Sequence, residues 1–264
     1  MTILDRIVAD KYKEIDLKKK LIPIAQLEQS VLYGRTAFSL ADNLKKSKNG
    51  IIAEHKRRSP SKAVINQQHN CFDVVKAYET AGVSGISVLT DGKYFGGSLD
   101  DLLVARASCQ LPLLRKDFVV DEYQIHEAKA YGADVILLIA AVLKKEEIKA
   151  FAITAKALGL ETLLEVHDAD ELHHSITPEV TMLGVNNRNL KTFEVTIDTS
   201  KTLSVEIPDE FVKVSESGIS EVHDIWELKK YGYQGFLIGE NFMKNDAIIP
   251  TTRKFIEEIE KKSF

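Results

Sequence analysis

Short apolar runs recur along the chain from Ile51 onward, separated by longer stretches in which apolar and polar residues alternate. The runs are Ile51–Ala53, Gly85–Leu89, Leu111–Leu114, Ala133–Ile139, Glu161–Val166, Met182–Val185, Phe211–Val214 and Gly235–Ile238. Continuous apolar runs of this kind are typical of parallel strands that are buried on both faces. The pattern therefore predicts eight strands in a parallel sheet.

Amphipathic stretches fill the intervals between these runs and predict one helix after each strand. They are Phe72–Ala81, Leu99–Ser108, Glu122–Tyr131, Lys145–Leu158, Asp170–Ile176, Ser200–Val205, Ile219–Tyr231 and Asp246–Lys261. A strand and a helix repeating every roughly 20 to 35 residues match a (β/α)₈ barrel. A doubly wound open sheet is the alternative, but the even spacing and the absence of GxGxxG favour the barrel.

The first 48 residues precede the first predicted strand and form an extension. Apolar residues recur there at helical intervals, and Pro23 separates this helix from a second helical patch at Leu40–Lys45. We expect the extension to act as a lid or a plug. The sequence thus predicts an α/β protein of one domain, residues 1–264, with a helical extension (1–48) and a TIM barrel (49–264).

Composition limits the classes of function. The chain has 35 basic and 39 acidic residues, so it lacks the basic excess that a nucleic-acid partner requires. With two cysteines and no CxxC, a reducing compartment is expected. The N-terminus does not resemble a signal peptide, and no window of about 18 apolar residues predicts a membrane span. We expect a cytoplasmic monomer or weak homodimer that acts on a small molecule.

Charged residues follow the first apolar run at once, in the sequence EHKRRSPS. If side chains alternate along the strand, Glu54, Lys56 and Arg58 point to one side, while His55 and Arg57 point to the other. An acid and a base then lie side by side at the C-terminal end of the strand. The alternative is a strand edge that runs into a solvated loop.

In a (β/α)₈ barrel the chemistry lies at the C-terminal ends of the strands. Lys56 and Lys116 follow the first and third runs, Glu165 stands near the end of the fifth, and Asn186 and Arg188 follow the sixth. Side chains of alternate strands reach into the same mouth of a closed barrel. A lysine flanked by acids can act as a general acid, and a carboxylate in an apolar setting as a base. Each residue alone is more often part of a structural ion pair, but three together at alternate strand ends favour a catalytic site.

Two glycines suggest a phosphate site. Gly218 and Gly239 are expected where the seventh and eighth helices begin, where backbone N–H groups and helix dipoles favour an anion. An N-cap in SESG and a turn in GEN explain the same residues without a ligand.

No HExxH spacing exists, so no metal site is expected. The histidines His55, His126, His167 and His223 are expected at the surface or at helix caps.

Seven segments carry a resemblance that covers almost the whole chain. They are IAEHKRRSPS, KYFGGS, LLRKDF, ETLLEVH, LGVNNRNL, SESGI and LIGENFM. In this order they resemble the indole-3-glycerol-phosphate synthase family of tryptophan biosynthesis. The resemblance implies a carboxy-lyase without a cofactor. Its reaction closes 1-(2-carboxyphenylamino)-1-deoxyribulose 5-phosphate to indole-3-glycerol phosphate, with loss of carbon dioxide and water.

The resemblance also implies roles for individual residues. Lys116 resembles the general acid that protonates the ribulose carbonyl, and Glu165 resembles its acid/base partner. Lys56, paired with Glu54, resembles a lysine that binds the substrate and its phosphate and serves as a second acid. The other implied site residues are Asn186, Glu216 and Arg188 for the hydroxyls and the catalytic set, Ser59 and Phe95 for the cavity lining, and Ser217, Gly218, Gly239 and Glu240 for the phosphate loops.

Two other classes of function remain open at this stage. One is a different phosphate-binding barrel, either a sugar isomerase or a Schiff-base aldolase with Lys56 or Lys116 as nucleophile. The other is a non-catalytic sensor, although converging lysines and glutamates favour catalysis. Two residues depart from the family pattern: Ala63 replaces a frequent Gly, and Glu240 replaces a Ser of some relatives. A carboxylate repels phosphate, so we expect Glu240 to contribute its backbone N–H.

Overall fold

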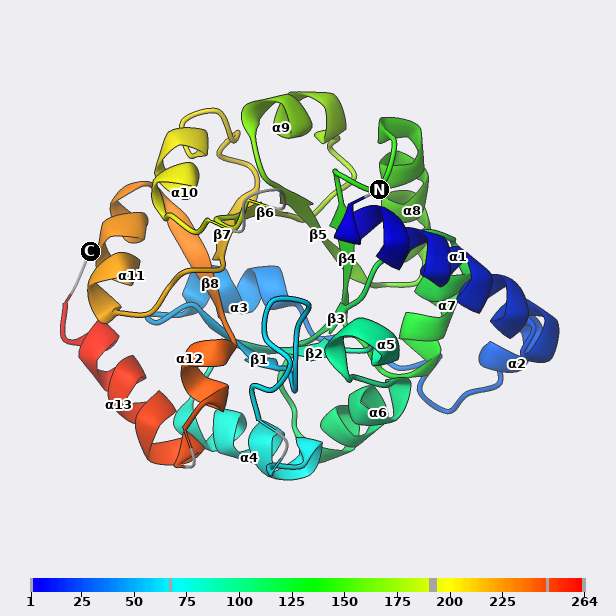
Figure 1. Cartoon of the computed structure of the whole chain (residues 1–264), viewed down its shortest axis with the longest axis horizontal. Helices are drawn as coiled ribbons and strands as arrows, with labels where there is room; N and C mark the ends of the chain where they lie inside the picture. Colours follow the sequence, from blue (N-terminus) through cyan, green and yellow to red (C-terminus); the bar gives the residue numbers. More distant parts are fainter. Residues whose placement is uncertain (1, 67, 190–193, 246, 263–264) are drawn as a thin grey trace.

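The computed structural model describes residues 2–66, 68–189, 194–245 and 247–262. These residues contain eight parallel strands, each paired with the next, and the last pairs with the first to close a barrel (Figure 1). The strands are β1 Ile51–His55, β2 Gly85–Leu89, β3 Leu113–Lys116, β4 Val135–Ile139, β5 Glu161–Val166, β6 Met182–Asn186, β7 Val212–Glu216 and β8 Tyr233–Ile238. The predicted (β/α)₈ barrel is confirmed.

Helices surround the barrel in the order that the amphipathic stretches predict. The outer helices are α4 Cys71–Ala81, α6 Leu99–Ser108, α7 Tyr123–Ala130, α8 Lys145–Ala157, α9 Ala169–Ser175, α10 Asp198–Leu203, α11 Val222–Lys230 and α13 Ile248–Glu260. Two short helices, α5 Gly92–Phe95 and α12 Glu240–Met243, follow β2 and β8 directly. The extension forms α1 Ile3–Leu21, α2 Ile24–Leu27 and α3 Leu40–Lys46. In the described part of the chain, no helix combines the length and apolar character needed to cross a bilayer.

Apolar side chains form one layer between strands and outer helices and a second layer inside the barrel. The inner layer includes Ile52, Leu114, Leu137, Leu163, Met182, Val212, Val214 and Leu237, together with residues of α3. These positions alternate with outward-facing ones along each strand, as the pleat requires. A barrel interior of this kind is a packed core and not a channel.

The third helix of the extension closes the N-terminal end of the barrel, as a plug. Leu40 and Leu44 are fully buried, and a Cβ atom on Gly85 would lie 2.5 Å from a Leu40 methyl carbon. The Glu161 carboxylate, at the start of β5, accepts hydrogen bonds from the Leu40 and Ala41 amides (2.9 and 3.0 Å). This acceptor satisfies N–H groups that the first turn of α3 leaves unpaired.

Several strands continue beyond the apolar runs that predicted them. The first was expected to end at Ala53, but β1 continues through His55, and β7 ends at Glu216 instead of Val214. The extra residues include buried carboxylates, since Glu54 is 3% and Glu216 2% exposed. Because these residues are charged, a search for apolar runs does not assign them to the strands, although they are part of the barrel wall.

Candidate active site

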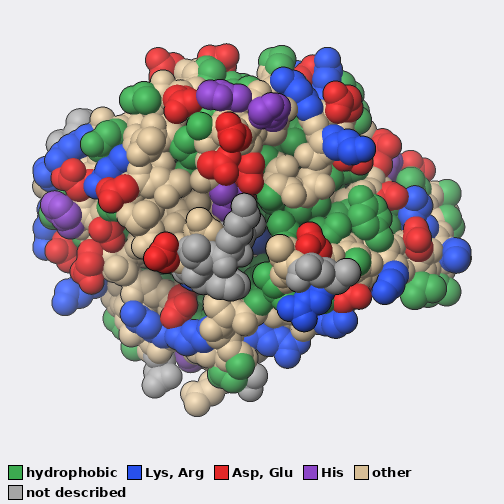
Figure 2. All heavy atoms as spheres, turned by 45° about the horizontal axis from the view of Figure 1, so that its top comes forward, with side chains coloured by type: hydrophobic (Ala, Val, Ile, Leu, Met, Phe, Trp, Pro, Cys, Tyr) green, Lys and Arg blue, Asp and Glu red, His purple; other side chains and the backbone are tan. Residues whose placement is uncertain are grey.

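A cavity of about 550 Å³ opens at the C-terminal ends of the strands. Every predicted site residue lines it: Glu54, Lys56, Ser59, Phe95, Lys116, Glu165, Asn186, Arg188, Glu216, Ser217, Gly218, Gly239 and Glu240. The fourth strand, β4, contributes the apolar side chains of Leu137 and Ile139 to the cavity wall. On the face shown in Figure 2, basic and acidic side chains are interspersed, in keeping with the net charge of −4.

One ammonium group lies between two carboxylates at the centre of this cavity. Lys116 Nζ, at the end of β3, donates to Glu165 Oε2 on β5 at 2.8 Å and to Glu216 Oε2 on β7. Asn186 Nδ2, at the end of β6, donates to the other Glu165 oxygen at 3.1 Å. Alternate strands therefore bring the three charges together, as predicted for Lys116 and Glu165.

Burial and charge set the protonation of this group. Burial opposes the charged form of Lys116, but Glu165 and Glu216 outweigh it and hold the Lys116 pKa well above its ordinary value. Burial also disfavours ionised Glu165, yet Lys116 and then His167 lower its pKa to about 2. For Glu216, burial with repulsion from Glu165 exceeds the attraction of Lys116 and raises the pKa to about 7. The site thus holds a proton donor, an ionised carboxylate and a carboxyl group that titrates near neutral pH.

His167 is a neighbour of Glu165 that the sequence reasoning left outside the site. Its side chain is 9% exposed, with Nε2 3.5 Å from Glu165 Oε1 and Nδ1 3.0 Å from Glu171 Oε2. Burial lowers the His167 pKa, but Glu171 and Glu165 outweigh burial and raise it. The expected position at the surface or at a helix cap was wrong for His55, which is 1% exposed within β1. His167 directly precedes Asp168, the N-cap of α9, but its ring lies beside Glu165. The spacing of Glu165 and His167 was the available signal, because residues two apart on a strand share a face.

Two glycines make room for buried carboxylates. A Cβ on Gly184 would lie 2.5 Å from Glu216 Oε1, and one on Gly239 would lie 2.4 Å from Glu54 Oε1. Either contact is far too short, so any side chain there would displace the acid. Glu54 in turn forms an ion pair with Lys56, which confirms the predicted pairing at the end of the first strand.

The loops after β7 and β8 line one side of the cavity. Ser217 and Gly218 have φ of 68° and 76°, a left-handed conformation that orients successive backbone N–H groups in a turn. The expectation that Gly218 begins the seventh helix was wrong, because α11 starts at Val222. Gly239 is the residue before the short helix α12.

The Glu240 side chain pairs with Lys62 Nζ at 2.6 Å, and this hydrogen bond lowers the Glu240 pKa despite partial burial.

The aromatic side of the cavity is made by Phe95 and by Phe118, which the sequence reasoning did not identify. Their ring centroids are 6.0 Å apart at an interplanar angle of 40°, a tilted pair of ordinary geometry. Arg188 lies nearby in sequence to Asn186, and its backbone N–H donates to the Asn186 side chain at 3.0 Å. That bond orients the amide that holds Glu165.

Arg57 and Arg58, the two arginines beside Lys56, hold neighbouring loops and helices in place. Arg57 makes a bidentate ion pair with Asp101, at 2.6 and 2.7 Å, and Arg58 donates to two backbone carbonyls of helix α5.

One potential metal-ligand atom from each of His55, Cys71 and Asp101 lies within 4.8 Å of the other two. Since Arg57 occupies both Asp101 oxygens, a cation there would face a guanidinium, and we assign this cluster to the support of Arg57.

Comparison with known proteins relates nearly the whole chain to one protein family. The family model described as Indole-3-glycerol phosphate synthase matches residues 4–258. An indole-3-glycerol phosphate synthase of Bacteroides thetaiotaomicron is 46% identical over 258 residues, which are 98% of this chain and 99% of that protein. One from Albidiferax ferrireducens is 42% identical, covering 92% of this chain and 93% of the other.

Solved structures of proteins with low sequence identity to this chain share its fold. A thiamine phosphate pyrophosphorylase from Pyrococcus furiosus superposes with a TM-score of 0.60 at 15% identity, covering 80% of this chain and 97% of that one. At such identity a shared barrel carries no statement about shared chemistry.

Proposed function

We propose that this protein, which belongs to the indole-3-glycerol phosphate synthase family, closes the indole ring in tryptophan biosynthesis. Its substrate is 1-(2-carboxyphenylamino)-1-deoxyribulose 5-phosphate, and its products are indole-3-glycerol phosphate, carbon dioxide and water. The observation that carries the proposal is the Lys116 ammonium held between Glu165 and Glu216 in the barrel mouth.

Ring closure requires a proton donor at a ketone. The ring carbon that bears the carboxylate attacks the ketone carbon, and Lys116 protonates the oxygen as the new carbon–carbon bond forms. Carbon dioxide then leaves, and its bonding electron pair restores the aromatic ring. The ionised Glu165 and the Asn186 amide keep the ammonium aimed at the oxygen, so the charge is stabilised by groups already in place.

Dehydration follows. The new hydroxyl group takes a second proton and leaves as water, while the neighbouring carbon loses a proton, so the whole reaction consumes one proton. Lys56 with Glu54, and Glu216 with its raised pKa, provide further donors and acceptors on the cavity wall. The residues whose pKa values are pushed apart are the acid/base candidates in such a site.

The rest of the substrate is held by the remaining cavity residues. Ser217, Gly218 and Gly239 bind the phosphate through backbone N–H groups, with charge from Lys56. Phe95 packs on the aromatic ring, and Ser59, Arg188 and the Glu240 backbone complete the wall. We further infer that residues 1–264 work as one domain, as a monomer or weak homodimer. Buried free Cys71 and Cys109 fit a cytoplasmic location.

The proposal is tested by mixing the purified protein with synthetic 1-(2-carboxyphenylamino)-1-deoxyribulose 5-phosphate and following indole fluorescence. We expect fluorescence to rise with one carbon dioxide released per indole formed. Absence of turnover would overturn the assignment. The Schiff-base alternative needs an unprotonated lysine, whereas the carboxylates around Lys116 favour its ammonium form. Borohydride should therefore trap no lysine–substrate adduct.

A further inference from the structure

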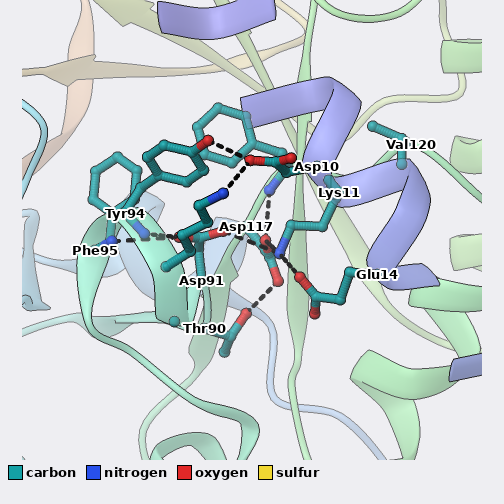
Figure 3. A network of polar contacts seen from close by, with 12 residues as sticks. Asp10, Lys11, Glu14, Thr90, Asp91, Tyr94, Phe95, Asp117 and Val120 are labelled. Atoms are coloured by element: carbon teal, nitrogen blue, oxygen red, sulfur yellow. Dashed lines mark hydrogen bonds and ion pairs between the residues drawn. The ribbon is translucent and has the colours of Figure 1, made fainter. Parts of the chain in front are cut away.

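Lys11 on helix α1 is buried although it belongs to a surface helix. It is 2% exposed, whereas the Lys13 side chain on the same helix is 78% exposed. Its Nζ lies 3.1 Å from Asp91 Oδ2, 3.0 Å from Asp117 Oδ1 and 2.9 Å from Glu14 Oε2 (Figure 3). A buried ammonium needs such partners to offset its desolvation, so this placement is specific.

Asp117 links Lys11 to the end of β3. It follows Lys116 directly, and its Oδ1 atom, which Lys11 contacts, also accepts the Phe118 N–H at 2.8 Å. The other oxygen accepts from Thr90 and Arg115 at 2.7 and 3.0 Å. The position of Phe118 therefore depends on a carboxylate that Lys11 helps to hold.

Asp91 links Lys11 to the second aromatic residue. Asp91 caps α5, and its Oδ1 accepts the N–H groups of Tyr94 and Phe95 at 2.7 and 3.3 Å (Figure 3). Its Oδ2 is the atom that pairs with Lys11. Among the described residues Lys11 is the cation paired with Asp91, whereas Asp117 also pairs with Arg115. Without Lys11, the Asp91 charge would be buried without that partner.

Helix α1 is itself part of the cavity wall. Ile3, Leu4 and Ile7 line the cavity, and Ile3, Ile7 and Lys11 are four residues apart, so they share one face of the helix. Asp10, which directly precedes Lys11, accepts hydrogen bonds from Lys93 Nζ and from the Tyr94 hydroxyl, both at 2.6 Å. The helix thus contacts the α5 segment through the buried Lys11 and the partly exposed Asp10.

We propose that Lys11 is a positioning residue that sets the spacing of Phe95 and Phe118. It thereby determines where the aromatic ring of the substrate binds. The proposal rests on the proposed function. Lys11 acts through Asp91 and Asp117 and does not touch the reacting atoms. Since Lys116 is held independently by Glu165 and Glu216, loss of Lys11 should weaken substrate binding more than it slows the chemical step.

The test compares Lys11→Met with Lys13→Met, a matched loss of an exposed lysine on the same helix. For Lys11→Met we expect KM to rise about tenfold with kcat within about threefold of wild type, and for Lys13→Met no change. The double variant Lys11→Met/Asp91→Asn should recover part of the loss, because asparagine keeps the capping oxygen and removes the uncompensated charge. Melting temperatures are measured alongside, because a purely structural role would lower the melting temperature without this split between KM and kcat.

An unchanged KM in folded Lys11→Met, or no recovery in the double variant, would overturn the positioning role. If Lys11→Met does not fold, Asp91→Asn alone decides, with Lys11 still paired to Asp117 and Glu14. Its KM should rise about threefold, and an unchanged KM overturns the proposal. Wild-type turnover, measured first, separates the two claims: its absence refutes the proposed function, whereas normal wild-type turnover with unchanged variants refutes only the role of Lys11.

Discussion

The Glu216 carboxylate occupies the space that a side chain at Gly184 would take, because a Cβ there would lie 2.5 Å from Glu216 Oε1. The two residues belong to neighbouring strands, β6 and β7, and Glu216 contacts Lys116 from this position. The missing side chain on one strand thus permits the buried acid on the next. Sequence alone marks Gly184 only as a glycine in an apolar strand.

Gly184→Ala should therefore damage catalysis by displacing Glu216 from Lys116. We expect kcat to fall about tenfold or more, since a misplaced catalytic group commonly costs this much. Gly34→Ala is the control, because a Cβ at Gly34 meets nothing within 4 Å. The kcat values and melting temperatures of both variants are measured together. A Gly184→Ala enzyme with wild-type kcat would show that the close contact is unimportant.

The two glutamates that contact Lys116 should affect stability in opposite directions as pH changes. The ordinary glutamate pKa is 4.5, and in the folded protein Glu165 titrates at about 2. Below pH 4.5 the unfolded state binds this proton first, so Glu165 stabilises the fold above that pH and this contribution is lost toward pH 2. Glu165→Gln should flatten the fall in the free energy of unfolding across this acid window.

Glu216 has the reverse effect because its folded pKa is about 7. Between pH 4.5 and 7 the folded state holds a proton that the unfolded state releases, so stability falls as pH rises. Glu216→Gln should remove this loss. Denaturant unfolding at several pH values measures both effects, and parallel pH profiles for the wild type and both variants would contradict these assignments.

Lys62 neutralises Glu240 beside the loops assigned to phosphate binding. Both side chains are nearly half exposed, so Lys62→Met should hardly change the melting temperature. It should raise KM for the phosphorylated substrate about threefold or more, since it leaves a carboxylate near the phosphate. Lys76→Met, which removes a lysine of similar exposure that pairs with Glu79 on α4, should leave KM unchanged. Equal KM values in the two variants would argue against phosphate binding near Glu240.

Catalysis should require no metal ion. The proposed proton donor is an ammonium group, and Arg57 occupies the Asp101 oxygens of the one candidate ligand cluster in the described residues. Exhaustive chelation should leave kcat unchanged. Lost activity that a divalent cation restores would refute this scheme.

The barrel could be predicted because each strand is buried on both faces and leaves a continuous apolar run. The charged ends of β1 and β7 could not, because Glu54 is buried through its pairing with Lys56 and its close approach to Gly239. Lys116 and Glu165 were predictable from their positions after alternate strands. His167 and Lys11 were missed because their burial depends on carboxylates contributed by the folded structure, which residue type alone does not reveal.

The kcat of Lys116→Ala for indole formation tests the central claim most directly. We predict a fall of about 10²-fold or more, the usual contribution of a positioned general acid, with the substrate's phosphate still bound by the loops after β7 and β8. A folded Lys116→Ala enzyme that keeps more than about a tenth of the wild-type kcat would contradict the assignment of Lys116 as the general acid.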